Sequence, residues 1–331
     1  MGAVLVTGGA GYIGSHAVKV LRARGRDVVV LDNLVAGHRA AVGDAPFVEA
    51  DVADAAAARQ TIRRHGVTAV MHFAAYLAVG ESVADPQRYY SNNVAGTLAL
   101  LRALRDESVT RLVFSSTAAV YGEPRETPIR ESHATDPINA YGETKLAIER
   151  ALPHYERAYG LRAIRLRYFN AAGADPDGDI GEDHRPEHHA VPRALAAAHG
   201  GPRFEVFGDD YPTADGTCLR DYVHVSDLAE AHVLALAALE SGAGSGVFNV
   251  GTGHPHSVRD VLASVERVTG RLPACEVSAR RAGDPAVLVA SSTRIRDSLG
   301  WHPRFEDLDT IVDTAWRWHR RHPEGYGTPA A

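Results

Sequence analysis

Tyr141 and Lys145 form the pattern Tyr-x-x-x-Lys, and their types and spacing suggest catalysis more directly than any other pair in this chain. Only two of the 35 basic residues are lysines, Lys19 and Lys145. On a helix this spacing puts both side chains on one face, with Cβ atoms about 5–6 Å apart. An ammonium near a phenol stabilises the phenolate and can also reach a ribose hydroxyl. The pair therefore predicts a catalytic acid/base beside a nucleotide cofactor.

A glycine-rich segment from Thr7 to Gly14 follows the apolar run Ala3–Val6 and precedes a helical stretch. Its glycines fit Gly-x-Gly-x-x-Gly, which lets a dinucleotide pyrophosphate approach the backbone at a helix N-terminus. Asp32 ends the next β-branched run, where a carboxylate accepts ribose hydroxyls and repels a 2′-phosphate. The alternative is a glycine-rich loop that only connects a strand to a helix. The strand before it, the helix after it and the acid at the end of the next strand together favour a dinucleotide site, and the acid favours NAD rather than NADP.

Composition limits the class of protein. The 331 residues are 45% apolar, which suits one large or two medium domains, and the net charge of −6 argues against a nucleic acid or an anionic membrane as partner. No apolar run is long enough for a transmembrane helix, and the first strand begins too early for a signal peptide. Two cysteines, Cys218 and Cys275, fit a reduced, cytoplasmic protein.

Apolar β-rich runs alternate with helical patterns in the first half of the chain, including expected helices over 93–106 and 142–159. This alternation predicts an α/β fold with a Rossmann-type doubly wound parallel sheet. The composition changes near Ala171, where a long Gly-, Asp-, Pro- and His-rich loop is expected. We therefore expect an NAD-binding Rossmann domain over residues 1–170 and a smaller α/β substrate-binding domain over 171–331. The expected strands are 4–6, 28–31, 47–48, 69–73, 112–114, 163–166, 204–206, 222–225 and 248–250.

The fingerprint and the Tyr-Lys pair make the chain similar to the extended short-chain dehydrogenase/reductase superfamily. Further segments resemble the UDP-glucose 4-epimerase family from end to end, and the block 215–225 is the most specific of them. They are Phe73-Ala-Ala, Val79-Gly-Glu-Ser, 92–97, 114–122, Arg167-Tyr-Phe-Asn, 208–213, 215–225, Arg280-Arg-Ala-Gly-Asp and the closing Arg321-His-Pro-Glu-Gly-Tyr.

The resemblance implies an NAD-dependent interconversion of UDP-glucose and UDP-galactose, through transient oxidation of the sugar at C4 to a 4-ketose that rotates and is reduced on its other face. In this family Tyr141 takes the proton of the 4-hydroxyl, and Thr117 bonds that hydroxyl. Lys145 holds the nicotinamide ribose and, with the cofactor, lowers the pKa of Tyr141. Homodimerisation through two helices of the cofactor domain is also expected by analogy.

The same resemblance assigns the remaining binding residues. The cofactor residues are Gly8, Gly11, Tyr12, Ile13, Gly14, Asp32, Asn33, Asp51, Val52, Phe73, Ala74, Ala75, Asn92, Lys145 and Tyr168. The substrate residues are Thr117, Tyr141, Asn170, His189, Phe207, Arg220, Tyr222, Arg281, Asp284 and Leu288, with Arg220 and Arg281 as partners of the diphosphate.

Two positions depart from the family pattern. Leu77 lies near a place where many members carry a lysine, so one positive contact to the cofactor is missing and NAD retention is less certain than NAD use. Leu288 lies at the position that gates the 2-substituent of the sugar, and its intermediate bulk leaves N-acetylated substrates open.

The sequence argues against one related activity and leaves others open. A 4,6-dehydratase needs an acid and a base after Thr117, where this chain has Ala118-Ala119. A UDP-pentose (xylose or arabinose) or a UDP-N-acetylhexosamine 4-epimerase stays open, and so, from another class, does a catalytically silent NAD-binding scaffold. We expect no metal, because His184, His188 and His189 lie in a loop without regular ligand spacing and without a nearby cysteine.

Overall fold

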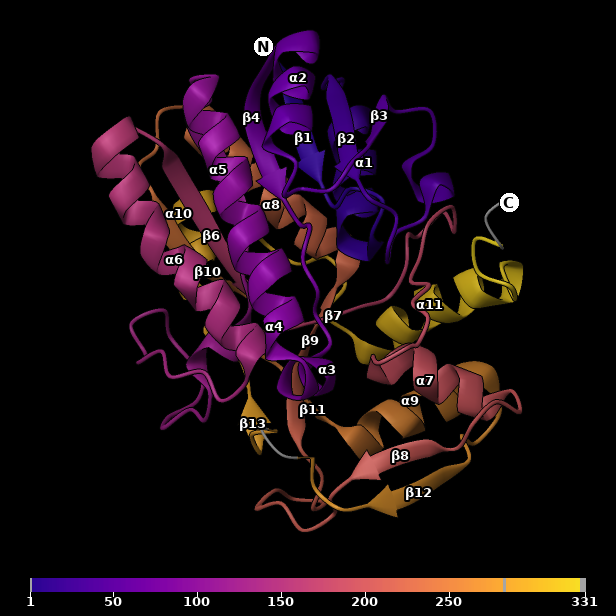
Figure 1. Ribbon diagram of the computed structural model, residues 1–331. Helices are drawn as coiled ribbons and strands as arrows, with labels where there is room; N and C mark the ends of the chain where they lie inside the picture. The colour runs from indigo at the N-terminus through magenta and orange to yellow at the C-terminus, as the bar shows by residue number, and fades with distance from the viewer. Residues whose placement is uncertain (1, 282–283, 328–331) are drawn as a thin grey trace.

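The computed structural model of the chain describes residues 2–281 and 284–327, and its largest element is a seven-stranded parallel sheet (Figure 1). The strand order is β10-β6-β5-β4-β1-β2-β3, and all neighbouring pairs are parallel. The order reverses beside β1, which confirms the predicted doubly wound fold. The strands are β1 (Ala3–Thr7), β2 (Val28–Asp32), β3 (Phe47–Glu49), β4 (Val67–His72), β5 (Arg111–Ser115), β6 (Arg162–Tyr168) and β10 (Gly246–Val250).

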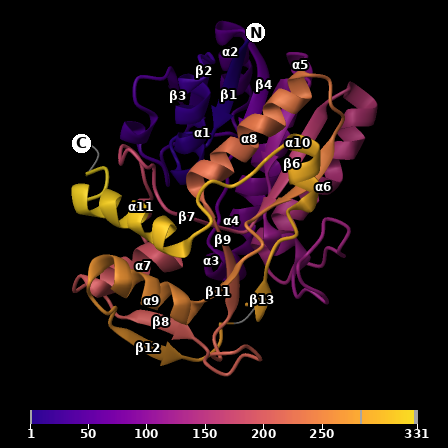
Figure 2. The same cartoon turned by 180° about the vertical axis from the view of Figure 1, so that it is seen from behind.

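Helices cover both faces of this sheet, as Figures 1 and 2 show from opposite sides. The central strands are apolar and fully buried because both of their faces need a covering layer. One core joins them to α1 (Tyr12–Ala23), α8 (Val225–Glu240) and α10 (Thr293–Leu299). A second core joins their other face to α2 (Ala55–His65), α5 (Thr97–Asp106) and α6 (Ala140–Tyr159).

A smaller part lies below the carboxyl ends of the large sheet in Figure 1. It has one sheet of order β11-β9-β13, with β7 also paired to β9, and a two-stranded sheet of β8 and β12. Its core packs α7, α9 and α11 against these strands. The elements are β7 (Asn170–Ala172), β8 (Phe204–Phe207), β9 (Leu219–His224), β11 (Pro255–Ser257), β12 (Cys275–Ser278), β13 (Val287–Leu288), α7 (Ala190–Ala198), α9 (Val258–Thr269) and α11 (Leu308–Arg321).

The chain returns to the large sheet after entering the smaller part. Strand β10 lies beside β6, in register from the pair Gly246 and Ile164 to the pair Val250 and Tyr168. Helices α8 and α10 also pack on the large sheet. Residues after 170 therefore contribute to both sheets, and the functional division at that residue stays a prediction.

Helix α6 carries the Tyr-Lys pair, and its ends have clear local causes. The Asn139 side chain accepts a hydrogen bond from the backbone of Gly142 and caps the first turn, so the helix includes Tyr141. Gly160 ends the helix in the left-handed conformation, with φ of +70°. The sequence predicted a start at 142, two residues later than the observed one.

The segment before α5 differs from the prediction. A single helix over 93–106 was expected, but the residues before Thr97 continue from α4 (Pro86–Tyr89) as the π-helical segment η2 (Tyr90–Gly96). The remaining short elements are α3 (Val79–Ala84), η1 (Arg39–Val42) and η3 (Ala118–Tyr121). The loop expected over 171–189 is confirmed for residues 173–189, which form neither helix nor strand, but Ala171 and Ala172 belong to β7. In the described part of the chain, no helix combines the length and apolar character needed to span a bilayer.

Candidate active site

A cavity of about 410 Å³ lies at the carboxyl ends of the large sheet and reaches the smaller sheet. Residues that follow or end successive strands line one side, among them Gly8, Asp32, Phe73 and Thr117. Residues of the smaller part, such as Arg220, line the other side. Ligands of open α/β sheets bind in this crevice, beside the strand where the order reverses.

The glycines of the first loop have different tasks. A Cβ on Gly8, whose φ is +71°, would lie 2.7 Å from the Cα atom of Ala74. A Cβ on Gly14 would lie 2.9 Å from Gly9, so both positions need glycine for internal packing. A Cβ on Gly11 would meet only the Gly8 carbonyl oxygen, at 3.4 Å. The space beside Gly11 is therefore open, at the N-cap of α1, where backbone N–H groups can receive a phosphate.

Asp32 ends β2 and lines the cavity, with its carboxylate held by two backbone donors. Ala10 N–H donates to its Oδ2 at 3.0 Å and Leu34 N–H to its Oδ1 at 2.8 Å. Burial raises the pKa of Asp32, and these N–H groups oppose the shift. Each carboxylate oxygen keeps a lone pair, so the side chain can still accept ribose hydroxyls.

Tyr141 lies in the first turn of α6, is buried, and lines the cavity together with Thr117. Burial, with Tyr168 adding to it, raises the pKa of Tyr141 well above the usual value for a phenol. The Thr117 hydroxyl acts in the opposite direction, because its hydrogen bonding lowers this pKa. A buried phenol of this kind can release its proton only when a cationic or hydrogen-bonding group stabilises the phenolate.

Lys145 lies one turn further along α6 and does not line the cavity. Its ammonium donates to the Ser115 carbonyl at 2.8 Å and lies 5.2 Å from the centre of the Phe114 ring. Burial lowers the pKa of Lys145 to about 7, with Glu149 acting in the opposite direction. Among the described residues Lys145 is not one of the groups that shift the pKa of Tyr141. The expected effect of this ammonium on the phenol therefore stays a prediction.

Two arginines line the cavity and share one carboxylate. Asp284 lies 3.6 Å from Arg220 Nη2 and accepts a hydrogen bond from Arg281 Nε at 2.9 Å. Arg220 also donates to the carbonyl of Pro285, and Arg281 lies over the Phe207 ring, 5.0 Å from its centre. Two guanidinium groups and one carboxylate leave an excess positive charge, which suits a diphosphate.

The structure brings nearly all predicted site residues to this one cavity. Two of them do not line it: Lys145, which lies behind the Tyr141 turn, and Asp51, whose carboxylate accepts a hydrogen bond from Asn33. The predicted residues that line it are Gly8, Gly11, Tyr12, Ile13, Gly14, Asp32, Asn33, Val52, Phe73, Ala74, Ala75, Asn92, Thr117, Tyr141, Tyr168, Asn170, His189, Phe207, Arg220, Tyr222, Arg281, Asp284 and Leu288.

Sequence reasoning missed several lining residues. Arg193 projects from α7 and donates to Glu205 at 3.1 Å, and His184 and His188 reach the cavity from the loop before α7. Gly37 packs so closely on Ala10 that a Cβ would lie 2.8 Å from its backbone. In the sequence, only the residue type of Gly37 could have indicated this close approach of two backbone segments.

Comparisons with known proteins show the family to which the chain belongs. The family described as "NAD dependent epimerase/dehydratase family" matches residues 4–251. A UDP-glucose 4-epimerase of Lacticaseibacillus casei is 50% identical over 326 residues, which are 98% of each chain. The crystal structure of UDP-glucose 4-epimerase from Brucella ovis in complex with NAD has a TM-score of 0.93 at 50% identity and covers 96% of this chain and 98% of that one. The enzyme of Bifidobacterium longum, in complex with NAD+ and UDP, has a TM-score of 0.92 at 36% identity, over 98% and 99% of the two chains.

Proposed function

Because the chain belongs to the NAD dependent epimerase/dehydratase family, we propose that it is an isomerase that interconverts UDP-glucose and UDP-galactose with NAD as cofactor. The observation that carries the proposal is that one cavity is lined by two groups of residues with different chemistry. Tyr141 and Thr117 line it, and so do Arg220 and Arg281.

Inversion at C4 of the sugar needs an oxidation, because the hydrogen at this carbon is not acidic. Bound NAD supplies this chemistry by accepting the C4 hydrogen with its electron pair and returning it. Tyr141 removes the proton of the 4-hydroxyl and later gives it back, and Thr117 positions that hydroxyl. The 4-ketose must turn over between these steps, so the protein holds the substrate by its diphosphate, through Arg220 and Arg281, rather than by its sugar.

The cofactor side fits NAD. The open space beside Gly11 takes the pyrophosphate, and Asp32 takes the adenosine ribose hydroxyls. Lys145, moved from the Ser115 carbonyl, takes the nicotinamide ribose and stabilises the phenolate of Tyr141. Residues 1–170 hold NAD in this proposal, and residues 171–331 supply most contacts to the nucleotide sugar.

The reaction can be tested with purified protein and three substrates in turn: UDP-galactose, UDP-N-acetylgalactosamine and UDP-arabinose. Chromatography should show conversion of UDP-galactose to UDP-glucose until equilibrium is reached. Conversion of UDP-arabinose or UDP-N-acetylgalactosamine alone would assign the pentose or N-acetylhexosamine alternative. No conversion of any substrate, with NAD added, would leave only the silent NAD-binding scaffold.

We also propose that the protein is a cytoplasmic homodimer that pairs through α5 and α6. Leu98 and Tyr159, on these two helices, are large apolar side chains exposed to solvent. Both cysteines are free thiols, which fits a reducing compartment. Light scattering after size-exclusion chromatography and cell fractionation test the two statements separately, and a monomer in solution would remove the first.

A further inference from the structure

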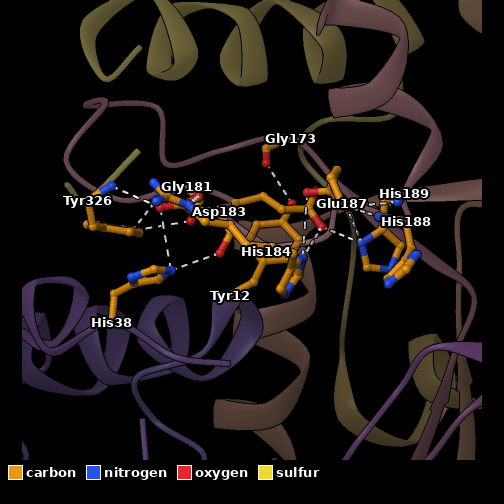
Figure 3. Close-up of polar contacts among 12 residues, drawn as sticks. Tyr12, His38, Gly173, Gly181, Asp183, His184, Glu187, His188, His189 and Tyr326 are labelled. Carbon is orange, nitrogen blue, oxygen red and sulfur yellow. Dashed lines mark hydrogen bonds and ion pairs between the residues drawn. The ribbon is translucent and has the colours of Figure 1, made fainter. Parts of the chain in front are cut away.

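The loop between β7 and α7 gathers two carboxylates and two imidazoles at one point beside the cavity. They belong to Glu182, His184, Glu187 and His189, and one ligand atom of each lies within 4.8 Å of all the others. His184 Nδ1 is 3.1 Å from Glu182 Oε1 and 3.7 Å from Glu187 Oε2. His189 Nδ1 contacts the same Glu182 oxygen and is 3.5 Å from Glu187 Oε1. Figure 3 shows His184, Glu187 and His189 turned toward one another.

Three of these atoms are buried and make no well-aligned hydrogen bond. Glu182 Oε1 lies at hydrogen-bond distance from His184 Nδ1 and His189 Nδ1, but none of the three makes a hydrogen bond of good geometry with any described residue. The side chain of Glu182 is only 4% exposed. A buried polar atom that lacks a partner destabilises the fold unless something else occupies its lone pair. Here three such atoms converge on one place, and one cation there would satisfy all of them.

We propose that this cluster binds one divalent metal ion of the zinc class, through Nδ1 of His184, Nδ1 of His189 and the carboxylates of Glu182 and Glu187. Two nitrogen and two oxygen donors suit a four-coordinate zinc site. Magnesium and calcium prefer oxygen donors alone. The spacing of His184, His188 and His189 looked irregular in the sequence, but the loop brings two of these histidines together with Glu182 and Glu187.

Contacts outside the cluster fix its ligands. The backbone N–H groups of His188 and His189 donate to Glu187 Oε1 at 2.7 and 2.8 Å, which leaves Oε2 facing His184. Asp183, between two of the ligands, accepts a hydrogen bond from the Tyr326 backbone at 3.0 Å. Its carbonyl lies 2.9 Å from His38 Nε2 (Figure 3). Orienting contacts of this kind accompany most metal sites in proteins.

A metal-free explanation is available, in which both imidazoles are protonated and pair with the two carboxylates. Burial lowers the pKa of His184, but Glu182 and Glu187 raise it to about 9 in all. Charge would then balance without an ion. However, ion pairs of imidazolium and carboxylate normally include well-aligned hydrogen bonds, and here neither Nδ1 makes one of good geometry, although both lie at hydrogen-bond distance from Glu182 Oε1. The experiment below separates the two explanations.

The position of the site indicates a structural task. The His184 ring meets Tyr12 edge to face, with centres 6.3 Å apart, and the Tyr12 hydroxyl donates to the Gly173 carbonyl at 2.6 Å. His189 is the N-cap residue of α7. With four protein ligands the ion has no open coordination position for a substrate. It would instead fix the loop between α1 on the cofactor side and α7 on the substrate side, whatever reaction the cavity supports.

The test measures metal in full-length protein purified without a polyhistidine tag. After incubation with zinc chloride and desalting, inductively coupled plasma mass spectrometry should detect about one zinc ion per chain. The variant H184Q/H189Q should retain less than about one tenth of this amount. H188Q is the matched control, because His188 is the neighbouring loop histidine outside the cluster, and it should keep the ion.

A second measurement covers the case in which the double variant does not fold. A chelator added to the wild-type protein should lower its thermal unfolding midpoint, and zinc should restore the midpoint while magnesium should not. Wild-type protein that takes up no zinc, or whose unfolding midpoint does not respond to the chelator, would overturn the proposal and leave the two ion pairs. Equal loss of zinc from H188Q would also overturn the assigned ligands.

Discussion

Gly11→Ala should weaken NAD binding without weakening the fold. Gly11 has φ of −79°, which alanine adopts readily, and the added Cβ would contact only the Gly8 carbonyl oxygen, at 3.4 Å. Alanine is a poorer N-cap than glycine, but it also restricts the unfolded chain. These opposed effects leave a change in unfolding free energy below about 1 kcal/mol.

The affinity for NAD should change more than the stability. The methyl group occupies the space in which the pyrophosphate meets the N–H groups of α1, so one charge-assisted hydrogen bond is lost. Such a bond contributes about 1.5–3 kcal/mol. The dissociation constant for NAD should therefore rise about 10- to 150-fold. Calorimetric titration of NAD-free protein measures this constant, and urea unfolding measures the stability.

Two variants serve as comparisons. In Gly14→Ala the new Cβ would lie 2.9 Å from Gly9, so this variant should lose about 1–3 kcal/mol of stability. In Gly244→Ala the exposed site has no neighbouring atom within 4 Å, and neither quantity should change. If Gly11→Ala bound NAD as tightly as the wild type, or unfolded as easily as Gly14→Ala, the assignment of this space to the pyrophosphate would be refuted.

Three further predictions concern Tyr141 and Arg281, which both line the cavity, and the buried lysine. Tyr141→Phe should lower kcat about 10²- to 10⁴-fold with UDP affinity unchanged, and near-normal turnover would place the base elsewhere. Arg281→Ala should raise the dissociation constant for UDP about 10- to 150-fold. Arg280→Ala should leave this constant unchanged, because the Arg280 guanidinium pairs with Asp210. Equal effects of the two substitutions would show that Arg281 does not bind UDP. Burial lowers the pKa of Lys145 to about 7, below the 10.5 of a free lysine. Between these two pH values the unfolded chain binds a proton at Lys145 that the folded chain has lost. The free energy of unfolding of NAD-free protein should therefore rise with pH in that window. Lys145→Met should make this rise smaller in urea unfolding at several pH values, and an identical slope would contradict the shift.

Local signals carried most of the sequence prediction. The glycine loop, Asp32 and the start of α6 each depend on a strand, a cap or a turn whose residues are neighbours in the chain. Periodicity could not place the Lys145 ammonium, because two side chains on one helix face can still point to different partners. Here the deciding partner, the Ser115 carbonyl, comes from the end of another strand.

Long-range contacts explain what the sequence did not predict. The π-helical η2 surrounds Asn93, whose buried side chain bonds the Tyr76 backbone and Thr144, two partners distant in the sequence. The loop 173–189 has no periodic pattern, and its shape depends on contacts with His38 and Tyr326 from both ends of the chain. Ligand spacings typical of helices and hairpins therefore could not predict that Glu182, His184, Glu187 and His189 of this loop lie close together.

The pairing of β10 with β6 means that the two functional halves cannot be separated by truncation. A fragment ending at residue 170 would turn β6 into an edge strand, with the backbone groups from Ile164 to Tyr168 left bare. It would also lose α8, and with it the cover over the apolar face of β5 and β6. Such a fragment should aggregate rather than bind NAD alone, so cofactor use and sugar recognition depend on a single cooperative folding event.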